Sequence, residues 1–210
     1  MKIDLETIEQ NQGYIAFLPY GIATIENEGG LVSGARAKKI RDSGGATKYG
    51  ISLSFLRRLE ISEADFNHDG LIDEQDIVIL NEKQSLALYF KYFWNNYYPM
   101  IAYKRLTFRI YDFGVNAGPG RSVRIWQNTI NQHLGYLALR VDGLFGTKSL
   151  AAANIVPPSA VKSLGELSYP LYVRNLEAYY RSLKKPGFIV GWLRRLKTFV
   201  TNSLTKQETK

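Results

Sequence analysis

The chain has 210 residues, 45% of them hydrophobic, so it can bury the core of one domain or of a catalytic core with a small appendage. It contains no cysteine and two histidines, His68 and His133, and neither histidine has a partner at metal-ligand spacing. This excludes disulfides and thiol nucleophiles and argues against a histidine-rich zinc site. The net charge of +8 predicts attraction to anionic surfaces.

The first helix is expected over residues 21–28. Apolar Ile22 and Ile25 keep helical spacing, Glu28 falls in the last turn, and Gly29-Gly30 is a typical helix stop. The sequence therefore places a carboxylate at the end of a helix.

A glycine-rich loop follows and carries a second acid and a threonine. Gly44-Gly45 predicts a tight turn, and residues 47–52 are β-prone and predict a short strand. Helix end, turn and strand would bring Glu28, Asp42 and Thr47 to one cleft. A carboxylic acid that protonates a leaving oxygen, with a second polar group that stabilises a cation or positions a water, suits glycosidic bond cleavage. The alternative is a solvated helix-end glutamate and an aspartate that caps a turn.

Residues 65–76 have the pattern of a twelve-residue calcium loop of the EF-hand or dockerin kind. Gly70 stands where the sharp turn is needed, and oxygen donors occupy every ligating position. The expected ligands are Asp65, Asn67, Asp69, the carbonyl of Leu71, Asp73 and Asp76. Asp76 replaces the usual glutamate and is one methylene shorter. We expect a structural Ca²⁺ here and no cofactor for catalysis; the alternative is an acidic surface turn.

The rest of the chain is predicted to be mainly helical. The helix that starts after Asn81 has a capping-box sequence, Asn81-x-x-Gln84, and Asp142-Gly143 predicts a tight turn. Apolar spacing assigns one face of that helix to the core, at Leu86, Tyr89, Phe90, Phe93 and Tyr97. Helices are expected over 53–59, 82–97, 106–116, 122–134, 171–183 and 188–199.

Five separated motifs resemble those of glycoside hydrolase family 108, the N-acetylmuramidases found among phage endolysins and related bacterial proteins. They are Glu28-Gly29-Gly30, the stretch Asp42 to Ser52 (D-x-G-G-x-T-x-x-G-I-S), Phe113 to Arg121 (F-x-x-N-x-G-x-x-R), Val141 to Leu150 (V-D-G-x-x-G-x-x-S-L) and Gly191 to Arg195 (G-W-x-x-R). The resemblance covers about residues 20–198. It departs from the family in the long basic span between Glu28 and Asp42.

The resemblance implies a lysozyme-like fold, mainly α within the α+β class, with a small β-element near the active site. It implies a catalytic part at 1–105 that contains the calcium loop, and a helical part at 106–202 that resembles a peptidoglycan-binding domain and packs on the first as one globular unit. Residues 203–210 would be a flexible tail.

The resemblance also implies roles for individual residues. Glu28 would be the general acid. Asp42 would stabilise the positive sugar or orient a water that Thr47 holds. Tyr49 and Asn116 are candidate substrate-binding residues; the alternative for Asn116 is a loop-capping asparagine. Trp192 and Arg195 are expected to be packing residues.

The expected activity is hydrolysis of the β-1,4 bond between N-acetylmuramic acid and N-acetylglucosamine in peptidoglycan, for host lysis by a phage. Two alternatives remain: a lytic transglycosylase, which uses one acid and forms an anhydro product, and a wall-binding module without catalysis.

The expected partners are peptidoglycan glycan strands. No nucleic-acid-binding motif is visible in the sequence, no run is apolar enough for stable membrane insertion, and we expect a monomer. The start of the chain is charged and unlike a signal peptide. We therefore expect synthesis in a bacterial cytoplasm and action in the periplasm or wall after release, for example through a phage holin.

Overall fold

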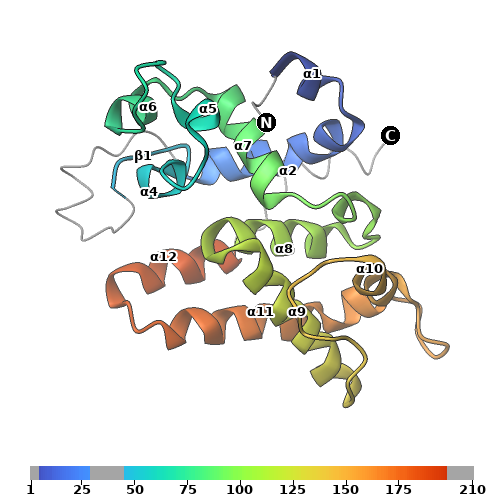
Figure 1. Ribbon diagram of the computed structural model, residues 1–210. Coiled ribbons are helices and arrows are strands. Elements are labelled where there is room, and N and C mark those ends of the chain that lie inside the picture. Colours follow the sequence, from blue (N-terminus) through green and yellow to red (C-terminus); the bar gives the residue numbers. More distant parts are fainter. Residues whose placement is uncertain (1–4, 29–44, 198–210) are drawn as a thin grey trace. The chain divides into compact units, whose positions relative to one another are not determined.

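The structure, a computed structural model, describes residues 5–28 and 45–197 and divides the chain into two compact units (Figure 1). Unit 1 comprises residues 1–92 and unit 2 residues 93–210. The described residues are mainly helical with one two-stranded antiparallel sheet, which confirms the expected fold class. No helix in these ranges is long and apolar enough to cross a membrane.

Unit 1 combines short helices with the sheet. Its elements are α1 (Leu5–Glu9), α2 (Gln12–Glu28), β1 (Thr47–Lys48), β2 (Ile51–Ser52), α4 (Leu53–Leu56), α5 (Ile61–Ala64), α6 (Glu74–Ile79) and α7 (Glu82–Phe93), whose last residue belongs to unit 2.

The helix that ends at Glu28 starts earlier than the sequence suggested. The Asn11 side chain accepts hydrogen bonds from the amides of Gly13 (2.8 Å) and Tyr14 (3.2 Å), and such a cap allows α2 to begin at Gln12. The helix continues through Pro19. Local capping therefore decided the start of α2. The predicted stop at Gly29-Gly30 lies outside the described residues.

The segment 47–52 is a hairpin, and the prediction of one continuous strand was wrong. Thr47 pairs with Ser52 and Lys48 with Ile51, with Tyr49-Gly50 as the turn. Both turn residues have positive φ, 52° and 77°, as a two-residue hairpin turn requires. Glycine at position 50 makes this turn accessible, and Ser52 then caps α4 by accepting a hydrogen bond from the Phe55 amide at 3.2 Å.

Helix α7 packs on α2 and carries five buried residues in a row, Ser85 to Tyr89. Its predicted capping box is present: the amides and side chains of Asn81 and Gln84 bond reciprocally at 2.9 Å. Phe90 of α7 packs against Tyr14 and Phe17 of α2, with ring centroids 5.3 and 5.6 Å apart. The helix ends at Phe93, short of the predicted residue 97.

A buried carboxylate, Glu63, joins α5 to α7. The Glu63 side chain is 3% exposed and accepts hydrogen bonds from Lys91 and Tyr92. Burial by itself would raise the pKa of Glu63, but the two hydrogen bonds and the charge of Lys91 lower it below its ordinary value. The carboxylate is therefore charged in the interior of unit 1.

Unit 2 is a helical bundle. Its elements are η1 (Tyr98–Met100), α8 (Lys104–Ala117), α9 (Pro119–Leu134), α10 (Thr147–Asn154), α11 (Leu164–Ser182) and α12 (Pro186–Lys197). Helix α8 packs on α9, α9 on α11, and α11 on both α10 and α12 (Figure 1). Asp142-Gly143 forms the predicted turn, with Gly143 at φ 81°.

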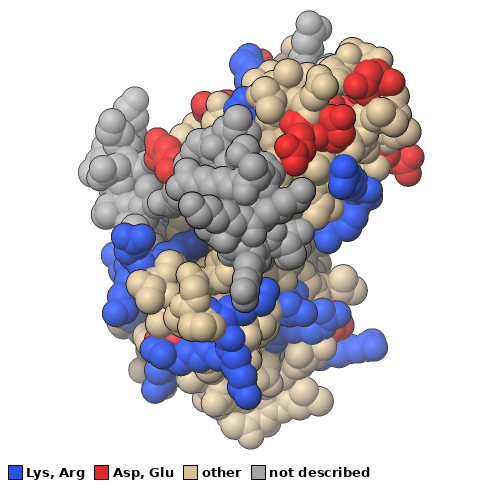
Figure 2. Space-filling model, turned by 90° about the vertical axis from the view of Figure 1, so that its left-hand side faces the viewer, with Lys and Arg blue, Asp and Glu red and all other residues tan. Residues whose placement is uncertain are grey.

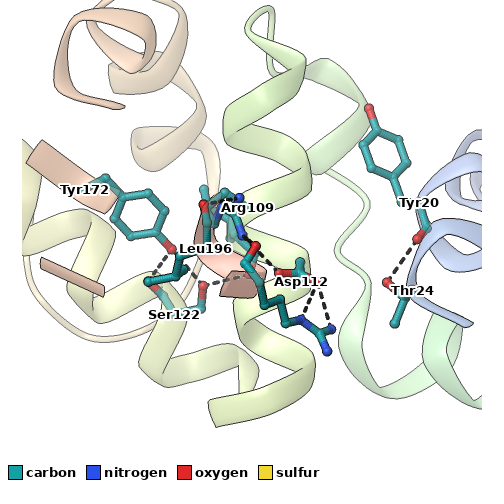
Figure 3. Close-up of polar contacts among 9 residues, drawn as sticks. Tyr20, Thr24, Arg109, Asp112, Ser122, Tyr172 and Leu196 are labelled. Carbon is teal, nitrogen blue, oxygen red and sulfur yellow. Dashed lines mark hydrogen bonds and ion pairs between the residues drawn. The ribbon is translucent and has the colours of Figure 1, made fainter. Parts of the chain in front are cut away.

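Two arginines surround a buried aspartate in unit 2 (Figure 3). The Asp112 carboxylate of α8 lies 3.2 Å from Nη1 of Arg109 and 2.8 Å from Nη2 of Arg195, and its side chain is 2% exposed. Arg109 also donates to the carbonyls of Arg195 (3.3 Å) and Leu196 (2.9 Å), near the end of α12. The Arg109–Asp112–Arg195 cluster thus fastens α12 to α8, and Arg195 is a packing residue as expected.

Candidate active site

Glu28, the predicted general acid, is half-buried at the last position of α2 and lies against the hairpin turn. A Cβ atom added at Gly50 would come within 2.6 Å of the Glu28 Cγ and 3.0 Å of its carboxyl carbon. Real Cβ atoms do not approach other atoms this closely. Gly50 therefore serves two purposes, since it permits the positive φ of the turn and leaves space for the acid.

Tyr89 of α7 also borders Gly50, beside Glu28. Its side chain is fully buried, as predicted, but its hydroxyl also donates a 2.8 Å hydrogen bond to the carbonyl of Tyr49. The same hydroxyl would lie 2.4 Å from a Cβ at Gly50. The sequence suggested only packing for Tyr89. A tyrosine at a core position needs a hydrogen-bond partner for its hydroxyl, and this need was the one sequence signal for a contact beyond packing.

Thr47 and Tyr49 lie on the same hairpin. The Thr47 hydroxyl donates to the carbonyl of Gly45 at 3.3 Å, which leaves its oxygen lone pairs as acceptors for a water. The Tyr49 ring has the Lys48 ammonium 5.6 Å from its centroid, and Lys48 also donates to the carbonyl of Val78 in α6 at 2.6 Å. Asp42, the second predicted acid, lies outside the described residues.

Asn116, the other candidate substrate-binding residue, is exposed in the last turn of α8 in unit 2. With its amide oxygen turned toward α12, it accepts hydrogen bonds from Nε and Nη1 of Arg195 at 3.0 and 3.2 Å. This partner supports the alternative of a structural asparagine, and the substrate role stays a prediction.

The loop 65–76 has a compact hydrogen-bonding pattern. The carboxylate of Asp65 accepts from the amides of Asp69 (3.2 Å) and Gly70 (2.9 Å), and Gly70 has φ 88°, which fits the sharp turn expected there. Asn67 donates to the Asp69 carboxylate at 2.8 Å. The acidic side chains thus face their own loop.

Asp76 closes the loop as the third residue of α6. It is fully buried, and its carboxylate accepts from the amides of Phe66 (2.7 Å), Asn67 (3.4 Å) and Asp73 (2.9 Å). Both carboxylate oxygens of Asp76 thus accept backbone amides. Within residues 5–28 and 45–197, no group of three or more His, Asp or Glu side chains is placed to hold a metal.

The chemistry available at the hairpin is proton transfer from a positioned carboxyl group. Glu28 is held at a helix end by a turn that Tyr89 fixes, and Thr47 offers a hydroxyl on the adjacent strand. Such an arrangement suits general acid catalysis, because a positioned donor must meet its acceptor atom with little freedom.

Comparison with known proteins agrees with this chemistry. Residues 22–118 match the family model described as glycosyl hydrolase 108, which confirms the resemblance over that stretch and supports a glycoside hydrolase. The match includes Glu28, the hairpin, the loop 65–76 and Asn116. No match was found among the curated proteins.

A structure described as that of Brucella abortus SagA is similar to most of the chain. The TM-score is 0.61 at 20% sequence identity, and the alignment covers 91% of this chain and 94% of that one. At 20% identity the similarity concerns the fold alone, and the aligned residues include parts of both units.

Proposed function

We propose that the protein is an N-acetylmuramidase that cleaves the β-1,4 bond between N-acetylmuramic acid and N-acetylglucosamine, with Glu28 as the general acid. The observation that best supports this proposal is the position of Glu28, which lies against the Gly50 turn within the stretch that matches glycosyl hydrolase 108. A peptidoglycan hydrolase is the function that this family match suggests.

In the proposed mechanism, Glu28 protonates the bridging oxygen as its bond to the anomeric carbon breaks. Positive charge develops on the sugar ring, and Asp42 stabilises it or orients the attacking water. Thr47 holds that water through its oxygen lone pairs. The water oxygen bonds to the anomeric carbon and yields a reducing sugar. The water keeps one hydrogen in the new hydroxyl group and gives its other proton to a carboxylate, either Asp42 or Glu28, which lost its own proton in the first step.

We propose the further parts of the function on the same basis. A role as a phage endolysin follows from the family resemblance, and unit 2, with 17 Lys and Arg against five Asp and Glu, would hold the enzyme on the anionic wall. We also propose Ca²⁺ in the loop 65–76, through Asp65, Asn67, Asp69, Asp73, Asp76 and the carbonyl of Leu71. The ion would order the loop without a part in bond cleavage.

The decisive experiment is clearing of outer-membrane-permeabilised bacteria and of purified sacculi by Glu28→Gln. The amide cannot donate the required proton, so activity should fall by about a hundred-fold or more while the melting temperature stays near that of the wild type. Glu26→Gln removes an exposed carboxylate from the same helical turn and should retain activity. Substantial turnover by Glu28→Gln would exclude Glu28 as the acid.

Mass spectrometry of the released fragments separates the enzymatic alternatives. A muramidase leaves a reducing N-acetylmuramic acid end, whereas a lytic transglycosylase leaves an anhydro end that is lighter by one water. A wall-binding module would sediment with sacculi and release no fragments.

Alanine at Asp42 or Thr47 tests the remaining roles. Each variant should lose most of its activity with little change in melting temperature. A variant that melts early but keeps full activity per folded molecule would show a structural role.

A further inference from the structure

The C-terminal helix pair of unit 2 presents a concentrated positive charge. Residues 181–197, here called the α11–α12 corner, contain six Lys and Arg and no Asp or Glu. Figure 2 faces the side on which α11 turns into α12, and Lys and Arg side chains gather there around an uncharged area. Five of the six cations are exposed. Arg181 pairs with Glu177, and the other four are Lys184, Lys185, Arg194 and Lys197.

The two faces of α12 differ in burial. On the inner face, Leu196 is 7% exposed and Trp192 stacks on Tyr180 of α11, with ring centroids 5.0 Å apart. The outer face carries Val190, Arg194 and Lys197, which lie three or four residues apart and therefore share one side of the helix. Val190 is 72% exposed, so an apolar side chain stands among cations on the open face.

The composition of the corner distinguishes between possible anionic partners. Its only uncharged side chain with a hydroxyl or amide is Ser182, whereas recognition of a sugar polymer relies on several placed hydrogen-bonding groups. Half-buried Phe188, Ile189 and Leu193 accompany the exposed valine. A helix of this kind, with apolar and cationic side chains together, suits the interface of a lipid bilayer.

We propose that the α11–α12 corner binds the surface of an anionic phospholipid bilayer. Lys184, Lys185, Arg194 and Lys197 contact the headgroups, and Val190 enters the boundary between headgroups and acyl chains. This interaction is separate from bond cleavage and does not depend on the role of Glu28.

The test is co-sedimentation of the full-length protein with vesicles. Vesicles of phosphatidylglycerol and phosphatidylcholine in equal parts should bind the protein, and vesicles of phosphatidylcholine alone should not. Because each cation near an anionic surface contributes about 1 kcal/mol, the double variant Lys184→Gln, Lys185→Gln should bind roughly 30-fold more weakly. High salt should weaken wild-type binding in the same direction.

Two matched controls isolate the corner. Arg140→Gln with Lys148→Gln removes the same charge from exposed positions elsewhere in unit 2 and should keep most of the binding. Val190→Ser should weaken binding several-fold, whereas Val161→Ser, at a valine that is 97% exposed, should not. All variants should keep the wild-type melting temperature, because the changed side chains are exposed.

Equal losses in the two charge variants would overturn the proposal, because binding would then follow net charge alone. Unchanged vesicle binding in the Lys184, Lys185 variant would also overturn it. A variant that loses binding to purified sacculi but not to vesicles would assign the corner to the glycan. Turnover of soluble glycan fragments, measured in parallel, reports on the proposed muramidase activity independently.

Discussion

The two units differ in charge and in the way their polar groups are used. Unit 1 carries 14 Asp and Glu against 10 Lys and Arg, whereas unit 2 carries five against 17. In unit 1, Glu28 and Thr47 lie on or against a small hairpin, on half-buried positions. In unit 2, the buried Arg109–Asp112–Arg195 cluster holds helices together, and exposed cations cover the surface.

The difference suggests that the two units have different roles. A basic unit attracts anionic envelope components at long range, whereas a site that must place a proton within hydrogen-bonding distance depends on short-range geometry. The following changes test whether fold stability and activity separate along this line.

The largest effect on stability is expected at Asp112. Asp112→Asn leaves Arg109, which is 1% exposed, without its charged partner, and loss of one member of a buried ion pair costs about 3 kcal/mol or more. Thermal or urea unfolding measures the change. Glu177→Gln, which breaks the exposed pair with Arg181, is the control and should cost less than about 1 kcal/mol. Equal effects of the two substitutions would contradict a stabilising role for the cluster.

The largest effect on activity apart from Glu28 is expected at Gly50. Gly50→Ala places a methyl group against Glu28 and Tyr89 and should reduce hydrolysis by about a hundred-fold, as for a misplaced catalytic group. Gly45→Ala is the control, because Gly45 also has positive φ (75°) but its nearest neighbour would be Leu53 Cβ at 3.6 Å. Both substitutions strain the backbone, so similar losses of activity would mean that strain alone is responsible.

Tyr89→Phe refines the same test. It removes only the hydroxyl that bonds to the Tyr49 carbonyl, and we expect kcat to fall by about ten-fold with little change in KM, since the turn that positions Glu28 loosens. Tyr92→Phe, on the same helix, removes a hydroxyl that bonds to Glu63 and should affect stability more than activity.

Glu63 predicts how stability depends on pH. Its pKa is lowered in the folded state, so its contribution is present above the unfolded pKa and is lost as the pH falls through the lower folded value. Unfolding in urea should therefore become easier below about pH 4.5, the ordinary value for the group. Glu63→Gln should cost about 2 kcal/mol at neutral pH and reduce this acid dependence. An unchanged pH profile would contradict the assignment.

The smallest expected effect is that of calcium. An ion bound only by the folded protein raises the melting temperature, by a few degrees when it is present well above its Kd. Chelation should reverse the shift, the double variant Asp65→Ala, Asp69→Ala should abolish it, and Mg²⁺ should replace Ca²⁺ poorly. Hydrolysis at low temperature should survive chelation. A melting curve that ignores both ion and chelator would make the loop 65–76 an acidic turn.

Short-range features of the fold could be predicted from the sequence. The Ser52 cap and the Asn81-x-x-Gln84 capping box each depend on residues within one helical turn. The Asp142-Gly143 turn belongs to the same group. Because capping and turn formation are local, their residues identify them without knowledge of the rest of the chain.

Long-range contacts were decided only by the tertiary structure. Tyr89 bonds to a carbonyl 40 residues away, Asp112 binds an arginine 83 residues away, and Asp76 accepts amides from the opposite end of its loop. That the hairpin turn at Gly50 leaves space for Glu28 also followed only from the tertiary structure. Spacing along the chain shows which face of an element is buried, but which groups meet across that face depends on how the elements pack.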